Sequence, residues 1–473
     1  MPDSVKTMDA SDIRSKFADY FTQKGHAPLH RAPLILKDDP TTLFTSAGMQ
    51  PLLPYLLGQP HPEGTRLTDV QPCFRAQDLE DVGDSRHTTF FEMLGNWSLG
   101  DYFKDEQIHW FFSFLVDEVG LDPNRLYVTV FSGNDEYGIP RDDEAARIWQ
   151  ELFESRGVEA KIVEIGDPAI GDTRGVNPGE RIFMYDDSQN WWSRGGGLAD
   201  TPIGDPCGPD SEVFYDFGEE HQDPSFGKSH PASDGGRFME IGNQVFMQYR
   251  RKDDGSFELL DRKNVDFGGG LERIAAAAAD TPDIFQISLL RPTVEALEGI
   301  TGTTYEDNTE AMRVIADHLR GAVFLVADGD IPSNKEQGYV LRRLIRRAIR
   351  YAHDLGVDAN MFERIVPTIV ATYADRYPFL KEKEEEIVAV LVKEERAFRR
   401  TLDKGLREFA KHADSELTGD EVFVLYDTYG FPKELTIEEA QKRGVPISPD
   451  WEAQFEAKME EQRQRSRGAR KAI

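Results

Sequence analysis

The chain has 473 residues, 39% of them hydrophobic, and a formal net charge of −30. That length is too great for one ordinary core, so we expect two or three domains. No apolar run reaches about 18 residues and the first residues are polar, so neither a membrane-spanning helix nor a signal peptide is predicted. The only two cysteines, Cys73 and Cys207, favour a reducing, cytoplasmic setting without a disulfide framework.

The first part of the chain mixes helical and strand patterns. Helical spacing of Ile13, Phe17 and Phe21 predicts an amphipathic helix that ends at Gly25. Strands are predicted at residues 213–217, 244–249 and 257–265, followed by a helix over 271–279. Glycines and prolines in residues 165–209 predict irregular loops. Such a mixture indicates an α+β fold with a mostly antiparallel sheet.

Helical periodicity dominates after residue 281. It predicts helices at residues 311–328, 338–353, 362–374, 381–413 and 437–443, and a charged helix over 451–473. We therefore expect a first domain over 1–280, an all-helical domain over 281–460, and the start of a linker over 461–473.

Two arginines and two aromatics form the first candidate site. We expect Arg75 and Arg86 on two antiparallel strands joined by a loop, where two guanidiniums can clamp a triphosphate. Phe90 or Phe91 then offers a flat face for adenine, and alternation alone does not choose between them. A hairpin with surface arginines and core phenylalanines is the plainer alternative.

A glycine-rich strand end forms the second candidate site. Gly268 and Gly270 let a ligand approach the backbone, because glycine has no Cβ. Arg273, one turn into the following helix, can lie over a base, and Asp266 can accept a hydrogen bond from an ammonium group. The alternative is an ordinary strand-to-helix turn.

Metal ligands are few. Glu240 and Asn243 offer two oxygens that suit Mg²⁺ shared with a nucleotide, although an ordinary surface pair fits as well. His26 and His30 have HxxxH spacing, but Pro28 lies between them and no second pair completes a zinc site. We expect no zinc.

The main cation cluster lies in residues 342–350, which hold no acid. It comprises Arg342, Arg343, Arg346, Arg347 and Arg350. Residues three or four apart share a helix face, so we expect an amphipathic helix with a cationic front for phosphates. A solvated surface helix is the alternative.

Several segments of the chain resemble the alanyl-tRNA synthetase family of class II aminoacyl-tRNA synthetases. Residues 86–96 (RHTTFFEMLGN) and 265–273 (VDFGGGLER) resemble motifs 2 and 3 of that class. Residues 43–49 (LFTSAGM), 338–343 (GYVLRR) and 425–432 (LYDTYGFP) resemble further family segments in the same order. The resemblance implies a class II antiparallel sheet flanked by helices, followed by the helical domain.

The resemblance also implies roles for single residues. Arg75 would contact the α-phosphate of ATP and Arg86 the outer phosphates, while Arg273 and one of the two phenylalanines would enclose adenine. Met49, Trp192, Asn243, Asp266, Gly268 and Gly270 would shape the alanine pocket. Asn334 and Asp427 match the family residues that read the G3·U70 pair of the acceptor stem.

The implied enzyme is an alanine–tRNA ligase with ATP, Mg²⁺, L-alanine and tRNA(Ala) as cofactors and partners, and it would be monomeric as this portion. Gly242 stands where the family usually has a tryptophan, and the family's editing domain is absent from the chain. A paralogue with a non-tRNA acceptor and a catalytically dead RNA-binding regulator are the competing hypotheses. The intact Arg75, Arg86, Asp266 and Arg273 argue against the regulator.

Overall fold

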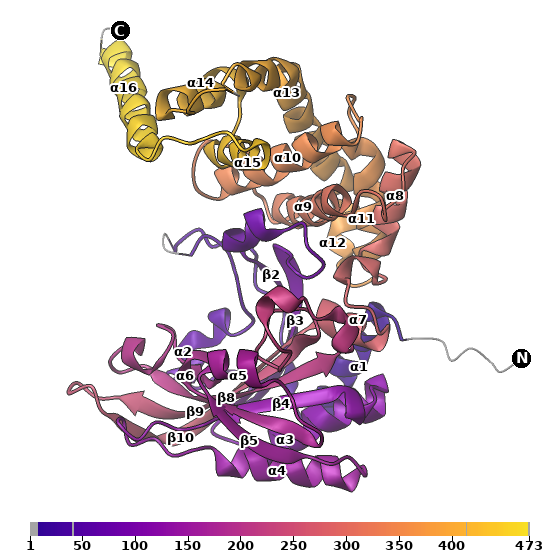
Figure 1. Cartoon of the computed structure of the whole chain (residues 1–473), viewed down its shortest axis with the longest axis vertical. Helices are drawn as coiled ribbons and strands as arrows, with labels where there is room; N and C mark the ends of the chain where they lie inside the picture. Colours follow the sequence, from indigo (N-terminus) through magenta and orange to yellow (C-terminus); the bar gives the residue numbers. More distant parts are fainter. Residues whose placement is uncertain (1–7, 40–41, 413, 472–473) are drawn as a thin grey trace, which may run out of the picture. The chain divides into compact units, whose positions relative to one another are not determined.

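The computed structural model describes residues 8–39, 42–412 and 414–471 and contains two compact units (Figure 1). The first unit holds the chain up to Leu34, then Phe44–Arg75 and Phe90–Arg291. The second holds Ile35–Leu43, Ala76–Thr89 and the chain from Pro292 onward. Two short segments of the N-terminal half thus belong to the second unit.

The first unit is built on a ten-stranded sheet with the order β1-β2-β3-β10-β9-β8-β4-β6-β5, and β7 pairs with β8. Its strands are β1 (Ala27–Pro28), β2 (Arg66–Phe74), β3 (Phe90–Leu99), β4 (Leu126–Phe131), β5 (Lys161–Gly166), β6 (Glu180–Tyr185), β7 (Trp191–Trp192), β8 (Pro206–Asp216), β9 (Phe238–Arg251) and β10 (Phe257–Gly270). The pairings from β2 through β3, β10, β9 and β8 to β4 are all antiparallel. The predicted antiparallel sheet is confirmed.

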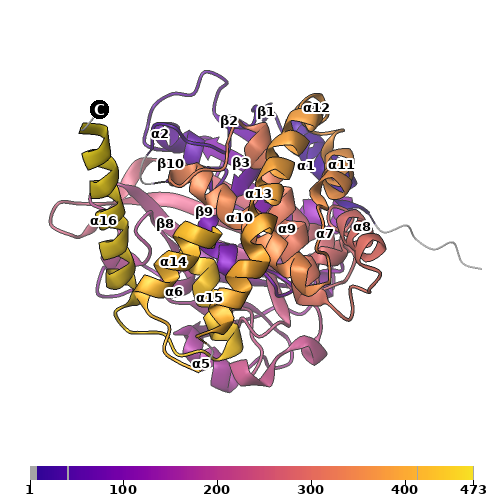
Figure 2. The same ribbon diagram turned by 90° about the horizontal axis from the view of Figure 1, so that it is seen from above.

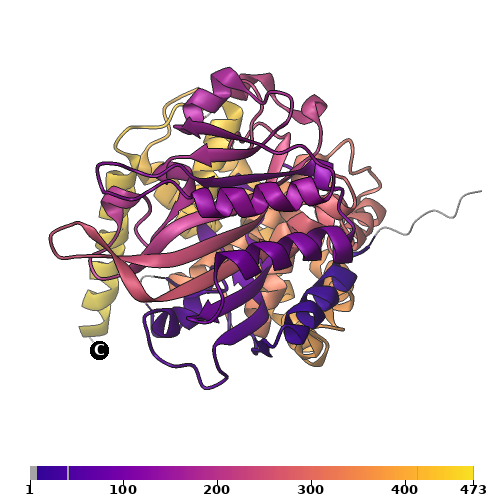
Figure 3. The ribbon, with the colours of Figure 1, turned by 90° about the horizontal axis from the view of Figure 1, so that it is seen from below.

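The helices of this unit are α1 (Ala10–Gln23), α2 (Leu53–Leu56), α3 (Lys104–Ser113), α4 (Asp143–Ser155), α5 (Pro168–Arg174), α6 (Asp187–Asn190) and α7 (Leu271–Ala278). Helices α1, α3 and α4 cover one face of the sheet (Figure 3). On that face, Phe267 of β10 stacks on Phe17 of α1 and contacts Phe111 of α3, with ring centroids 6.1 and 4.4 Å apart. Side chains alternate along a strand, so the neighbours of Phe267 point to the opposite face.

The second unit is helical throughout its described C-terminal part, as the periodicity predicts (Figure 2). Its helices are α8 (Arg291–Thr301), α9 (Thr309–Ala327), α10 (Glu336–Asp354), α11 (Phe362–Tyr373), α12 (Pro378–Glu382), α13 (Glu384–Ala410), α14 (Gly419–Tyr429), α15 (Lys433–Arg443) and α16 (Trp451–Lys471). Helix α9 is buried along most of its length and packs against α10. The last two residues of the predicted helix 451–473 lie outside the described residues.

One prediction about local structure is wrong. Residues 165–209 are not irregular loops, because they include β6, whose six residues are all buried. Strand β6 lies between β4 and β5 and is parallel to both. In the part of the chain that the structure describes, no helix is long and apolar enough to cross a membrane.

Candidate active site

The face of the sheet opposite to Phe267 carries the candidate alanine site. Three neighbouring strands, β9, β10 and β3, place Val245, Asp266 and Trp97 in one row. The next row on the same face joins Asn243, Gly268 and Gly95. The strand register therefore brings three predicted residues together and adds Trp97, which the sequence pattern did not single out.

Asp266 is the anionic group of this face. Its side chain is buried, with 7% of the residue exposed, and its Oδ1 accepts a hydrogen bond of 2.8 Å from Nε1 of Trp97. Burial raises the pKa of Asp266 to about 6, and the bond from Trp97 opposes that rise. Because the hydrogen bond from Trp97 offsets only part of the effect of burial on this carboxylate, the group is well suited to bind a positively charged ammonium group.

Glycine is required where the Trp97 ring crosses the sheet. A Cβ on Gly95 would lie 2.2 Å from that ring, and a Cβ on Gly268 would lie 3.0 Å from Sδ of Met93. Gly95 thus leaves the space in which the indole of Trp97 lies against the backbone, and Gly268 leaves space for the side chain of Met93.

Two further predicted pocket residues, Met49 and Trp192, lie against the apolar cluster that contains Trp97. Both side chains are partly buried. The cluster comprises Leu52, Leu56, Leu67, Trp97, Leu99, Val245 and Met247. Met49 and Trp192, although far apart in the sequence, thus pack against the cluster that contains Trp97 and Val245, the two residues paired with Asp266 across the sheet.

The predicted ATP residues divide between the units. The guanidinium of Arg75 lies 4.8 Å from the ring centroid of Phe91, and its Nε donates to the carbonyl of Ser46 at 3.1 Å. Phe90 is fully buried, so of the two phenylalanines only Phe91 has an accessible face. Arg86 belongs to the second unit and lies in a bend four residues before β3, so the prediction that it stands on a strand is wrong; its backbone N–H donates to Asp84.

Arg273 and Arg75 share an acidic neighbour. Nη1 of Arg273 donates to the backbone carbonyl of Glu240 at 3.1 Å. Burial raises the pKa of the Glu240 carboxyl, and the positive charges of Arg273 and Arg75 oppose that rise. Arg75, predicted to contact the α-phosphate, and Arg273, predicted to lie over adenine, therefore act on the same carboxyl.

A β-bulge gives the Glu240–Asn243 pair a common face. Val213 of β8 pairs with Gly242, but the next residue pairs with Glu240, so β9 has one extra residue there. Without that bulge, residues three apart on a strand would point to opposite faces. The amide nitrogen of Asn243 donates to Asp210 at 3.2 Å, while its Oδ1 is buried without a partner among the described residues.

The oxygens around this bulge fit a shared magnesium ion better than a closed metal site. Within residues 8–39, 42–412 and 414–471, no group of three or more His, Cys, Asp or Glu side chains is arranged to hold a metal. Mg²⁺ that is shared with phosphates needs only one or two carboxylates. Glu240 and the unpartnered Oδ1 of Asn243 meet that requirement.

The arginines of α10 do not form an exposed cationic front, so that prediction is wrong. Arg342 and Arg346 each lie 2.8 Å from Glu394 of α13. Arg347 pairs with Glu438 at 2.9 Å, Arg350 with Glu439 at 2.6 Å, and Arg343 with Glu80. These four glutamates lie far from α10 in the sequence. They neutralise the arginines and partly bury this face of the helix. Binding of tRNA by these arginines stays a prediction.

Comparison with known proteins places the chain in a family. The sequence profile of the family described as tRNA synthetases class II (A) matches residues 12–473. The chain belongs to this class II synthetase family. It is similar to the alanine–tRNA ligase of Treponema denticola, with 41% identity over 94% of this chain and 70% of that protein. The alanine–tRNA ligase of Fusobacterium nucleatum is also 41% identical, over 98% of this chain and 50% of its own length.

This synthetase-family chain spans about half the length of several of the relatives it matches. Among solved structures, the histidyl-tRNA synthetase of S. aureus matches 57% of this chain and 65% of its own, with 11% identity and a TM-score of 0.32.

Asn334 and Asp427, which the sequence analysis predicts as acceptor-stem readers, are both exposed in the second unit. Oδ1 of Asn334 accepts a hydrogen bond of 2.6 Å from Arg342. Oδ1 of Asp427 accepts one of 2.5 Å from Gln462 of α16. Each side chain thus has a partner within the unit that an RNA base would have to replace or share.

Proposed function

We propose that this chain activates L-alanine with ATP and transfers the alanyl group to the 3′ end of tRNA(Ala). The observation that carries the proposal is the row of Val245, Asp266 and Trp97, in which a buried carboxylate is hydrogen-bonded to a tryptophan. The neighbouring row contains Gly268 and Gly95. The similarity to alanine–tRNA ligases supports the same assignment.

Asp266 binds the ammonium group of alanine in this proposal. The positive charge compensates the burial that raises the pKa of Asp266, so alanine binds best when this carboxyl is ionised. Met49 and Trp192 close the apolar side of the site. Rejection of larger amino acids then follows from space, because the Trp97 ring occupies the face above Gly95.

Activation is an in-line displacement at phosphorus. A carboxylate oxygen of alanine forms a bond to the α-phosphorus of ATP, the bond from that phosphorus to the bridging oxygen breaks, and pyrophosphate leaves. Arg75 and Arg273 stabilise the negative charge that develops on the α-phosphate oxygens. Phe91 offers its ring to adenine. Glu240 and Asn243 would hold Mg²⁺, which would neutralise charge on the phosphates.

Transfer requires the second unit to present the RNA. We propose that Asn334 and Asp427 contact base edges of the G3·U70 pair in the shallow minor groove of the acceptor stem. Their exposure supports the assignment, because both side chains are accessible from solvent.

Alanine-dependent exchange of labelled pyrophosphate into ATP tests the activation step. We expect exchange with alanine and weaker exchange with glycine and serine, since a methyl or hydroxyl group changes binding by only about 1–3 kcal/mol. Buffer without amino acid is the control. Absence of alanine-dependent exchange by a folded sample would refute the proposed function.

A further inference from the structure

Helix α13 carries a row of cations on its solvent side. Lys393, Arg396, Arg400, Lys404 and Arg407, together the α13 stripe, are all exposed. They follow one another at intervals of three or four residues, so they share one helix face. Among the residues that the structure describes, none of the five side chains has an ion-pair partner.

Two acidic residues on the buried side of α13, Glu394 and Glu395, do have partners within the unit. Glu394 holds Arg342 and Arg346 of α10, and Glu395 accepts hydrogen bonds from the backbone of Met361 and Phe362. These two acids of the helix are thus used to neutralise groups in the interior of the unit. Neither of them faces the stripe as a partner.

Composition does not account for the stripe. The chain holds 85 acidic and 55 basic residues, so acids to neutralise a surface cation are plentiful. Like charges four residues apart, such as Arg396 and Arg400, destabilise a helix. The five cations of the stripe extend over about four turns. The exposed Asp403 lies beside them, three residues after Arg400, and it pairs with His353 rather than with a residue of the stripe.

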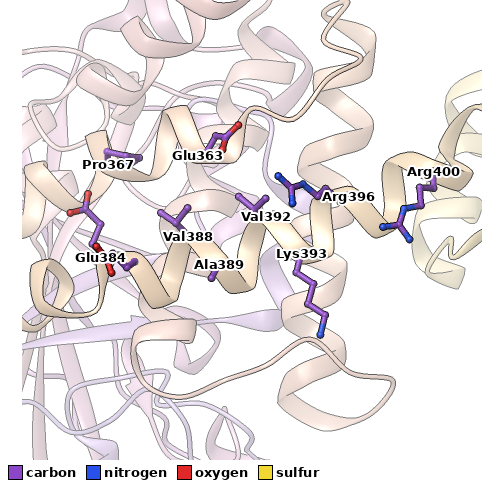
Figure 4. A pocket seen from close by; sticks show the side chains of 10 residues that line it. Glu363, Pro367, Glu384, Val388, Ala389, Val392, Lys393, Arg396 and Arg400 are labelled. Carbon is purple, nitrogen blue, oxygen red and sulfur yellow. The ribbon is translucent and has the colours of Figure 1, made fainter.

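A groove between α11 and α13 borders the start of the stripe (Figure 4). Its volume is about 710 Å³, and Pro367, Val388 and Val392 form part of its lining. Lys393, Arg396 and Arg400 follow one another along α13 at one end of it, whereas Glu384 lies at the other end (Figure 4). Glu363 of α11 also lines the groove, toward Arg396 (Figure 4), so the groove carries acids as well as cations and does not by itself select an anion.

We infer that the α13 stripe is the docking surface for the phosphate backbone of RNA. The inference rests on the proposed function, and it assigns to α13 the role that the sequence pattern predicted for α10. The row from Lys393 to Arg407 is about 21 Å long at 1.5 Å per residue, long enough to follow several phosphates. Lysine and arginine that neutralise phosphates release counterions, which makes binding favourable and salt-dependent.

A membrane surface fits the stripe less well. Helices that lie on membranes present an apolar face beside their cations. Leu391, Phe398 and Leu402, which lie along the length of the stripe, are buried in the unit. The accessible Val388 lines the groove before the stripe begins, so the stripe itself offers charge, which suits a phosphate backbone.

The test compares two variants in which five positive charges each are removed. The stripe variant changes Lys393, Arg396, Arg400, Lys404 and Arg407 to Gln. The control variant changes Lys16, Arg141, Arg147, Arg156 and Lys161 to Gln, all exposed and all ion-paired in the first unit. Filter binding of a tRNA(Ala) transcript is measured between about 50 and 200 mM salt. Far-ultraviolet circular dichroism checks the fold of both variants.

We expect the stripe variant to bind RNA at least tenfold more weakly. The steepness of its plot of log K against log salt should fall by about one for each phosphate that the variant no longer neutralises. The control variant should keep both the affinity and the slope. Equal slopes in the stripe variant and the unmodified chain, or an equal weakening of RNA binding in both variants, would overturn the inference. So would binding of phosphatidylserine vesicles that depends on the stripe while RNA binding does not.

Pyrophosphate exchange without RNA separates this inference from the proposed function. Exchange depends on alanine and ATP alone, whereas filter binding depends on RNA alone. If the unmodified chain shows no exchange, the proposed ligase activity is refuted. The salt dependence of RNA binding still tests whether the α13 stripe binds RNA.

Discussion

Replacement of Asp266 by Asn removes the negative charge of this side chain and keeps its size and shape. The substitution therefore measures how much the buried charge lowers the free energy of unfolding. Asn keeps an oxygen that can accept the hydrogen bond from Nε1 of Trp97, now 2.8 Å long. It removes the charge that burial disfavours. We therefore expect the variant to be more stable than the unmodified chain at neutral pH, and to lose alanine binding, because no carboxylate is left for the ammonium group.

The magnitude follows from the pKa. Asp266 has an ordinary value of 3.8 and a folded value of about 6. Between these values the folded chain binds a proton that the unfolded chain lacks, so the free energy of unfolding falls as pH rises through this window. Above the folded pKa the full cost is about 3 kcal/mol, and roughly half of it is already present at pH 5.

Urea unfolding of both proteins at pH 5.0 and 7.5 measures the effect, and circular dichroism follows the transition. The stability gained by Asp266→Asn should grow by about 1.4 kcal/mol between these pH values. Other carboxyls titrate in both proteins alike, so the difference isolates Asp266. A gain that is the same at both pH values, or a loss at pH 7.5, would refute the argument that burial dominates at this carboxyl.

Five further substitutions test the two units. Arg75→Ala and Arg273→Ala should each abolish pyrophosphate exchange while the fold, seen by circular dichroism, is kept; exchange near the unmodified rate would remove that residue from the ATP site. Gly95→Ala places a Cβ 2.2 Å from an indole ring, so the KM for alanine should rise at least tenfold with little change in the KM for ATP. Arg347→Ala leaves a carboxylate partner unpaired and should lower stability by about 3–5 kcal/mol, whereas the unpaired Arg396→Ala should change it by less than about 0.5 kcal/mol in urea unfolding.

Local periodicity was enough to predict the elements that frame the site. The strand before Gly270 and the helix after it are confirmed as β10 and α7, because the alternation of Asp266, Phe267 and Gly268 and the alanine run that follows are local signals. The same alternation explains why Phe267 packs under the helices while Asp266 points to the other face. Strand β6 was missed because glycines and prolines on both sides outweighed its short apolar run.

Local sequence patterns could not predict which residues of distant strands would lie side by side in the sheet. Trp97 reaches Asp266 only through the register of β3 and β10, and its one sequence cue was a large aromatic two residues after Gly95. The bulge in β9 has one weak local cue, because a glycine within a strand, here Gly242, often marks a bulge, but the sequence does not show that the extra residue lies between Glu240 and Gly242. Gly242, which departs from the family pattern, has a packing reason: a Cβ there would lie 2.6 Å from the Phe111 ring.

The two arginine-bearing helices show why charge patterns need tertiary context. Helix α10 has the denser cluster in sequence, with no acid among residues 342–350, yet its guanidiniums are taken up by carboxylates from α13, α15 and residue 80. Helix α13 looks mixed in sequence because Glu394 and Glu395 lie among its cations, yet those acids point inward. Paired guanidiniums must give up a carboxylate to bind a phosphate, whereas the cations of the α13 stripe give up only water and counterions. The helix with the weaker pattern in sequence is therefore the stronger candidate for RNA contact.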